Sequence, residues 1–271
     1  MQKNYHNFLA LALAGMGLFY FSPAKSQLVV NSAVTATQMA TALVGNGGVN
    51  IANITSNCAT GAWGMFSNGA TTTLGINSGI ILTNGSSTSP WPLGNPASSF
   101  NTTNNGFPGD SWLNTYGVTT VPTYNACILE FDATPICDTI RFRYVFASEE
   151  YPEWVNTSFA DAFAFFISGP GYPVGTNIAK VPIVNQTINI NTVNAGNFGC
   201  PGPPTGCSNC AYYINNCTCP NIVYDGRTVV MTAQAIVTPC ATYHIKLSIA
   251  DGSDQIYDSG VFLETGTPRS L

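Results

Sequence analysis

The chain has 271 residues, of which only 8% are charged, with 13 acids against 8 bases and a formal net charge of −5. The few bases are scattered, so the chain lacks the basic stripe that phosphate backbones require, and we do not expect a nucleic acid partner. The length suits one large all-β domain or two small domains.

The first 26 residues have the features of a secretory signal peptide. Lys3 precedes an apolar stretch, Phe8–Phe21, that is too short to span a bilayer, and Ala24-Lys25-Ser26 fits the small-x-small cleavage rule. A retained membrane anchor is the alternative. We expect cleavage before residue 27, a single domain over residues 27–271, and a secreted or cell-surface protein with no membrane insertion after the signal is removed.

The remaining sequence predicts one helix followed by short strands. Thr35 or Thr37 can cap a helix that ends at Gly45. Strands are expected over Val49–Thr55, Gly79–Leu82, Ile128–Phe131, Thr139–Ala147, Ala160–Ser168, Val181–Ile190, Val229–Val237, Tyr243–Ala250 and Gly260–Glu264, with a long loop over Ser86–Gly109. Such a pattern predicts an all-β fold, a β-sandwich or jelly-roll-like domain with one short N-terminal helix.

Nine cysteines in an exported chain favour disulfides, and five of them fall within Cys200–Cys219. We expect a Cys-rich loop insertion over residues 198–222 that disulfides order, with a zinc site at Cys207-x2-Cys210 as the alternative. Cys127 could also join Cys137 across neighbouring strands. The disulfide candidates are Cys127, Cys137, Cys200, Cys207, Cys210, Cys217, Cys219 and Cys240, and the odd total leaves one thiol free or intermolecular.

Acids gather in two places in this weakly charged chain. Glu149, Glu150 and Glu153 lie between two apolar runs, and Asp161 opens the second run. A second group forms an Asp-Gly-Ser-Asp loop. If the groups meet, their oxygens suit calcium, with Glu149, Glu150, Asp161, Asp251, Asp254 and Asp258 as ligands. The alternative is that these acids accept backbone hydrogen bonds or pair with Arg141, Arg143 and Arg227.

Aromatic residues in polar loops predict a second kind of site. Trp91 and Trp154 each lie beside a proline, and Tyr151 lies nearby. Exposed rings among amides suit contacts with a sugar or a protein. The alternative is that these rings close the ends of the core, where large aromatic side chains usually lie.

Catalytic patterns are weak. A glycosidase using Glu149 and Glu150 is the enzyme alternative, but Glu149 and Glu153 on one strand face would lie about 13 Å apart, too far without a bend. His244 is the one histidine after the signal segment, and it lies in an alternating strand, as expected of a structural histidine. We therefore predict that the chain is not an enzyme.

Several long segments resemble the choice-of-anchor L domain family, notably FASEEYPE within Leu129–Val155, Phe159–Gly171, and IADGSDQIYDSGVFLE within Thr238–Glu264. The resemblance covers roughly Ala33–Glu264. It implies an extracellular β-rich domain, in a family with many members from Bacteroidetes and often exported by the type 9 secretion system. We expect a non-catalytic binding or adhesion module, calcium-stabilised, with an extracellular glycan or surface protein as partner. A purely structural surface module is the alternative.

Overall fold

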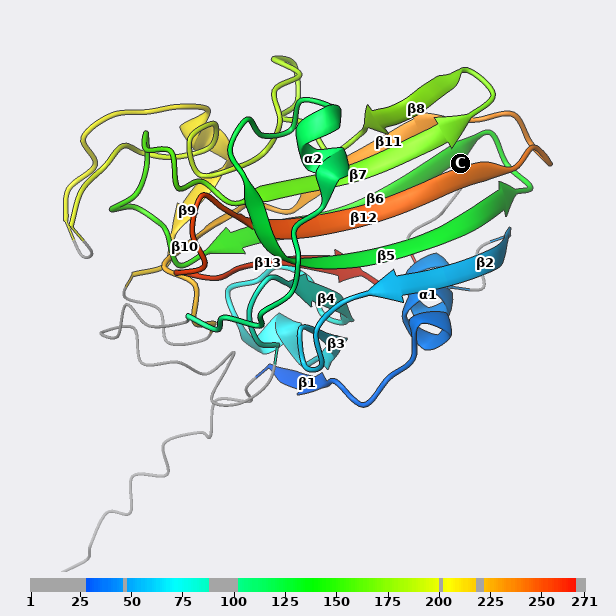
Figure 1. The fold of residues 1–271 in the computed structure, drawn as a ribbon, viewed down its shortest axis with the longest axis horizontal. Coiled ribbons are helices and arrows are strands. Elements are labelled where there is room, and N and C mark those ends of the chain that lie inside the picture. Colours follow the sequence, from blue (N-terminus) through cyan, green and yellow to red (C-terminus); the bar gives the residue numbers. More distant parts are fainter. Residues whose placement is uncertain (1–27, 46–47, 88–101, 200–201, 218–221, 267–271) are drawn as a thin grey trace, which may run out of the picture.

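In a computed structural model the chain forms two antiparallel sheets packed face to face (Figure 1). The structure describes residues 28–45, 48–87, 102–199, 202–217 and 222–266. The larger sheet has the strand order β1-β3-β4-β13-β6-β10-β9, with β11 also paired to β6, and the smaller sheet has the order β2-β5-β12-β7-β8. The predicted all-β sandwich is therefore confirmed. The predicted signal peptide lies outside the described residues.

The elements have the following bounds. The larger sheet contains β1 (Val29–Asn31), β3 (Trp63–Ser67), β4 (Gly79–Thr83), β6 (Thr139–Ser148), β9 (Tyr213–Asn215), β10 (Gly226–Thr228), β11 (Met231–Ile236) and β13 (Ser259–Glu264). The smaller sheet contains β2 (Val49–Asn57), β5 (Thr123–Pro135), β7 (Ala162–Gly169), β8 (Tyr172–Asn177) and β12 (Tyr243–Gly252). Helices α1 (Ala36–Val44) and α2 (Ser111–Thr115) and the 3-10 turns Gly69–Thr71 and Cys210–Tyr212 complete the described part.

Helix α1 begins and ends as the sequence predicts. The Thr35 hydroxyl accepts a hydrogen bond from the backbone N–H of Gln38, and the Gln38 side chain accepts one from the N–H of Thr35. This reciprocal capping box satisfies two of the N–H groups left free at a helix start. Gly45 ends the helix with a φ of +59°, a conformation that glycine adopts without steric cost.

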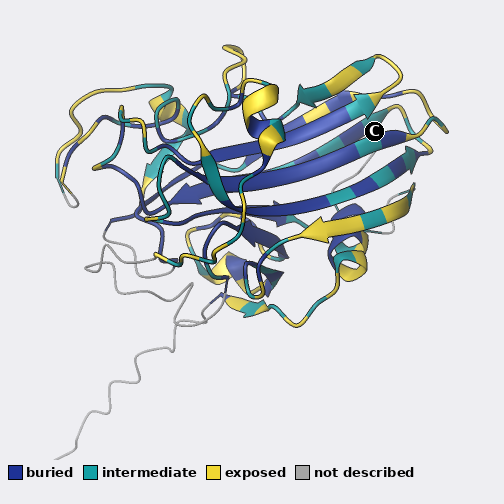
Figure 2. Ribbon diagram, viewed as in Figure 1, coloured by how far each residue is buried: buried dark blue, intermediate teal, exposed yellow. Residues whose placement is uncertain are grey.

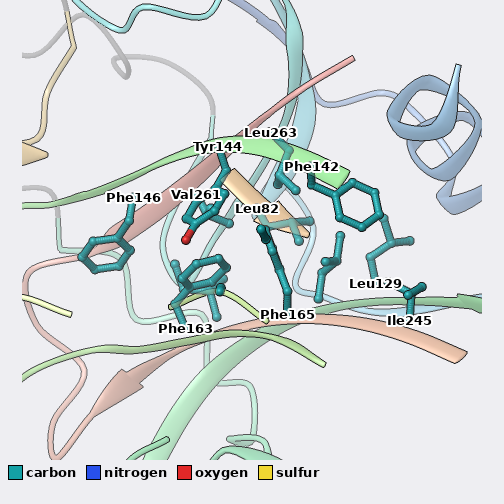
Figure 3. Close-up of a cluster of buried hydrophobic side chains, with 14 of the residues drawn as sticks. Leu82, Leu129, Phe142, Tyr144, Phe146, Phe163, Phe165, Ile245, Val261 and Leu263 are labelled. Carbon is teal, nitrogen blue, oxygen red and sulfur yellow. The ribbon is translucent and has the colours of Figure 1, made fainter. Parts of the chain in front are cut away.

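The core lies between the sheets and is rich in aromatic rings (Figure 3). Phe142, Tyr144 and Phe146 share the inward face of β6, as the predicted alternation requires. They meet rings on β7: Tyr144 lies 5.0 Å from Phe165 and Phe146 lies 6.0 Å from Phe163, centroid to centroid. Figure 2 shows that the central strands are buried and that the edge strand β2 is largely exposed.

One predicted strand is wrong. Val181–Ile190 forms a turn instead, with a single bridge between Lys180 and Thr187. Ile183 and Asn185 have φ values of +72° and +57°, which are incompatible with extended backbone. The pattern also missed β1, β3, β8, β9, β10 and helix α2, all of which are short.

Candidate functional site

The predicted acids come from the ends of four adjacent strands. Glu149 and Glu150 follow β6, Asp161 precedes β7, Asp251 lies near the end of β12, and Asp258 precedes β13. Strand β13 pairs with β6 through Ser259 and Ser148, and β12 pairs with β7 through Ala250 and Ala162. The pairing within each sheet therefore gathers these carboxylates at one end of the sandwich, to the left in Figure 1. With Asp225, these side chains are called the acidic cluster below.

Asp161 links the two sheets within the acidic cluster. Its Oδ1 accepts a 3.0 Å hydrogen bond from the N–H of Gly252, and its Oδ2 accepts a 2.7 Å bond from the Asn84 side chain. Its own N–H donates to Oε2 of Glu150 at 3.1 Å. Burial raises the pKa of Asp161 to about 8, although the hydrogen bonds from Asn84 and Gly252 to its carboxylate oppose the shift.

Glu149 carries the most unusual environment in the cluster. The residue is 2% exposed, and neither carboxylate oxygen has a hydrogen-bond partner. Burial, and then the charges of Asp225, Asp258 and Glu153, raise the pKa of Glu149 well above its ordinary value. A buried carboxylate without a partner is costly unless it takes up a proton or a cation.

The remaining acids of the cluster show the same trend. Burial, and then the charge of Asp161, raise the pKa of Asp251 to about 10, and its Oδ1 is buried without a partner. Burial raises the pKa of Asp225 and of Asp258 to about 7. For Glu150, burial and the charge of Asp161 raise the pKa well above the usual range.

Asp254 and Asp225 depart from the sequence prediction in opposite ways. Asp254 is only partly buried, and its carboxylate caps the N–H of Ile256 at 3.2 Å, so it lies at the rim. Asp225 is 7% exposed and its charge acts on Glu149, although no sequence argument singled it out. A lone acid preceding β10, after the Cys-rich loop, carries no local signal of such a role.

Two of the arginines have other partners. Arg143 pairs with Glu264 at 2.5 Å, and Arg227 donates to the carbonyls of Thr228 and Thr73. The ion pairs of Arg143, His244 and Lys246 involve Glu264, Glu130, Asp132 and Asp110, all of which lie outside the acidic cluster. Backbone capping by the acids is present in part, since Asp258 accepts from the N–H of Thr103 at 3.1 Å.

The carboxylates do not converge on a common point. Within the described part of the chain, no group of three or more Asp, Glu, His or Cys side chains is arranged to hold a metal ion. A calcium ion would therefore have to draw the side chains together and take further ligands from backbone carbonyls and water, which calcium accepts readily.

The predicted ligand-binding aromatics fall in three different situations. Trp91 lies outside the described residues. Trp154 is partly buried, with its ring 5.4 Å from Phe159 and 5.7 Å from Tyr257. Tyr151 is fully buried and its hydroxyl donates to the Val193 carbonyl at 2.6 Å. A buried ring cannot reach an external ligand, so Tyr151 is a core residue and we do not retain it as a ligand contact.

A polar pocket lies next to the turn that carries Trp154. It has a volume of about 280 Å³ and is lined by residues 117–121, 157, 158, 160, 189 and 191. The Asn191 side chain donates to the Thr157 carbonyl at 2.8 Å and accepts from the N–H of Asn156 at 2.6 Å. These bonds fix the turn against the pocket wall. The lining offers hydroxyl and amide groups and no charged side chain.

The cysteines correct two expectations. Cys127 pairs with Cys58, which was not among the candidates, and not with Cys137. Asn57 lies opposite Ile128 on neighbouring strands, so the two cysteines are adjacent across the sheet. Cys207 bonds to Cys210, which excludes zinc at that pair, and Cys217 is also disulfide-bonded. Cys137 and Cys240 are unpaired thiols, while Cys200 and Cys219 lie outside the described residues.

Two polar arrangements on β12 concern stability. His244 contacts Asp132 at 2.9 Å and Glu130 at 3.3 Å, which confirms the expected structural histidine. Lys246 is 4% exposed and pairs with Asp110 and Glu130, each at 3.1 Å. The sequence did not indicate the Lys246–Asp110 pair, because 136 positions separate the partners.

Comparison with known proteins identifies the family. The family model of the choice-of-anchor L domain matches residues 28–268, nearly the whole chain. The chain belongs to the choice-of-anchor L domain family. This family indicates a surface or secreted module, typically non-catalytic. No curated protein and no solved structure matches the chain significantly. Among the described residues, the choice-of-anchor L domain has no helix long and apolar enough to cross a membrane.

Proposed function

We propose that this choice-of-anchor L domain is a non-catalytic extracellular binding module whose acidic cluster takes up calcium. The observation that carries the calcium proposal is Glu149, whose two carboxylate oxygens are buried without a partner beside Asp225 and Asp258. Calcium prefers such oxygen ligands, and its charge would offset the repulsion among the acids. Because the ligands are not yet convergent, the metal would also order this end of the sandwich.

Thermal unfolding of the full chain in calcium and in EDTA tests this proposal. A ligand that binds only the folded state raises the melting temperature. We expect a rise of several degrees at millimolar calcium, and a much smaller one in Asp251→Asn. Magnesium at the same concentration is the control, because it dehydrates reluctantly and demands stricter geometry. Identical melting curves with and without calcium would show that the acidic cluster does not bind calcium.

For the external partner we propose a neutral glycan that contacts the pocket beside Trp154. Hydroxyl and amide linings suit sugar hydroxyls, and Trp154, three residues before the lining residue Thr157, would supply an aromatic ring for the apolar face of a sugar. Trp154 belongs to the turn that hydrogen bonds fix against this pocket. A surface protein is the other class of partner.

A glycan array probed with the wild type and with Trp154→Ala tests the glycan. Selective binding that Trp154→Ala abolishes, at an unchanged circular dichroism spectrum, supports the proposal. Trp112→Ala is the matched control, because Trp112 packs 5.6 Å from Phe166 outside this pocket. No binding by the wild type would favour the purely structural module. Hydrolysis of a bound glycan, lost in Glu150→Gln, would favour the enzyme alternative.

A further inference from the structure

The two unpaired thiols, Cys137 and Cys240, lie in two turns that cross between the sheets. The turn of Cys137 connects β5 of the smaller sheet to β6 of the larger sheet. The turn of Cys240 connects β11 of the larger sheet to β12 of the smaller sheet. Both turns lie at the right-hand end of Figure 1, opposite the acidic cluster.

Backbone hydrogen bonds hold the two turns together. The N–H of Val237 donates to the carbonyl of Asp138 at 2.7 Å, which continues the β11–β6 ladder past Ile236 and Thr139. The N–H of Cys240 itself donates to the carbonyl of Pro135 at 2.7 Å. Cys240 therefore makes one of the two bonds itself, and Cys137 lies between their acceptors, Pro135 and Asp138.

The local shape of the second turn brings Cys240 toward its neighbour. The N–H of Ala241 donates to the carbonyl of Thr238 at 3.1 Å, closing a four-residue turn with Cys240 at a φ of +65°. The Val237–Asp138 bond lies one step past the last ladder pair, Ile236 and Thr139, and one further step places Thr238 opposite Cys137. A disulfide requires Cα atoms roughly 4.4–6.8 Å apart, so the two turns, which share backbone hydrogen bonds, bring the cysteines into the neighbourhood where such a bond is tested.

We propose that Cys137 and Cys240 form a disulfide that clasps the two sheets at this end of the sandwich. Cys240 is exposed and Cys137 is partly exposed, so an oxidant reaches both thiols. The disulfides Cys58–Cys127 and Cys207–Cys210 place the chain in a compartment where such bonds persist.

The chemistry is a thiol–disulfide exchange with an external disulfide. The thiolate of one cysteine attacks a sulfur of that disulfide, forms a mixed disulfide and releases one thiolate. The second cysteine then attacks the mixed disulfide, closes the Cys137–Cys240 bond and releases the second thiolate. The two cysteines lose two protons and two electrons, and the external disulfide is reduced to two thiols.

Peptide mapping of the full chain after equilibration with oxidised glutathione tests the proposal. Free thiols are blocked with iodoacetamide before digestion without reductant. We expect a linked peptide pair containing Cys137 and Cys240, and neither cysteine alkylated. In Cys240→Ser, the linked pair should disappear and Cys137 should carry either glutathione or the alkyl group, while Cys58–Cys127 stays linked as the internal control.

Stability gives an independent readout. The bond would close a loop of about 100 residues, so Cys137→Ser/Cys240→Ser should melt about 10 °C below the oxidised wild type. Alkylation of both thiols in the oxidised wild type would overturn the proposal. So would a linkage of Cys240 to a second copy of the chain or to another cysteine.

Discussion

Asp161 accepts a hydrogen bond from the backbone N–H of Gly252 at 3.0 Å, and this bond joins the start of β7 to the end of β12. The charge of Asp161 in turn raises the cost of ionising Asp251. The same Asp161 offers its N–H to Glu150, which follows a strand of the other sheet. Three carboxyls, from the ends of β6 and β12 and the start of β7, thus share one buried region.

Stability without metal should fall as the pH rises from 5 to 8. The pKa values of Asp161 and Asp251 are raised to about 8 and about 10, against a value near 3.8 in the unfolded chain. The folded state therefore binds more protons than the unfolded state, and stability is lost as pH rises toward the folded-state pKa values. Each such carboxyl contributes about 1.4 kcal/mol per pH unit.

Urea unfolding in EDTA at several pH values measures this slope. Asp138 is exposed and lies at the opposite end of the sandwich, so Asp138→Asn should leave the slope unchanged. Added calcium should flatten the slope near neutral pH, since the cation replaces the protons. Stability that rises steadily with pH in EDTA would show that these carboxyls are ionised at little cost.

Replacing Glu149 by glutamine should distinguish the role of Glu149 in calcium binding from its effect on the stability of the metal-free fold. The amide has the same shape without the charge, so in EDTA the variant should be at least as stable as the wild type at pH 8. The raised pKa of Glu149 is the reason, because ionising this carboxyl opposes folding. The stabilisation by calcium should fall by more than half in Glu149→Gln, measured by calorimetry and by the shift in melting temperature. A full calcium response in this variant would exclude Glu149 as a ligand.

The sequence predicted those features that depend on local pattern. The capping residues around Thr35 and the alternation of Phe142, Tyr144 and Phe146 rest on spacing along one segment, and both are confirmed. The acids after β6 were also recognised, because they stand out in an uncharged chain. Asp225 was not, since its place beside Glu149 depends on how β10 pairs with β6.

The features that the sequence did not predict depend on contacts between strands that are distant in the chain. Cys58 was omitted as a disulfide partner because only the register of β2 against β5 places it beside Cys127. Tyr151 was predicted at the surface from its polar neighbours, but its turn folds inward and its hydroxyl meets Val193. Periodicity describes one strand at a time, and these residues take their surroundings from others.

Gly85 should be intolerant of a side chain. A Cβ at this position would lie 1.7 Å from Oδ2 of Asp258, and 2.6 Å from its Cβ, so Asp258 would have to move. Gly85→Ala should therefore lower the free energy of unfolding by about 1–3 kcal/mol and weaken the calcium response. Gly199→Ala is the matched control, because nothing lies within 4 Å of its Cβ position. Equal effects in the two variants would show that Asp258 can move freely.

The buried pair of Lys246 and Asp110 should be the most sensitive ionic contact in the described part of the chain. Lys246 donates to Oδ1 of Asp110 at 3.1 Å and lies 4.7 Å from the ring centre of Trp112, while Ser248 donates to Oδ2 of Asp110 at 2.7 Å. Lys246→Met keeps the length of the side chain but leaves Asp110 buried without its cation. Such a loss costs about 3–5 kcal/mol, which urea unfolding would measure directly.

The double variant Asp110→Asn/Lys246→Met should recover part of this loss, because no buried charge then lacks a partner. Arg143→Met, which breaks a partly exposed pair with Glu264, should cost about 1 kcal/mol or less. If Lys246→Met cost no more than Arg143→Met, the buried pair would contribute no more than a surface contact.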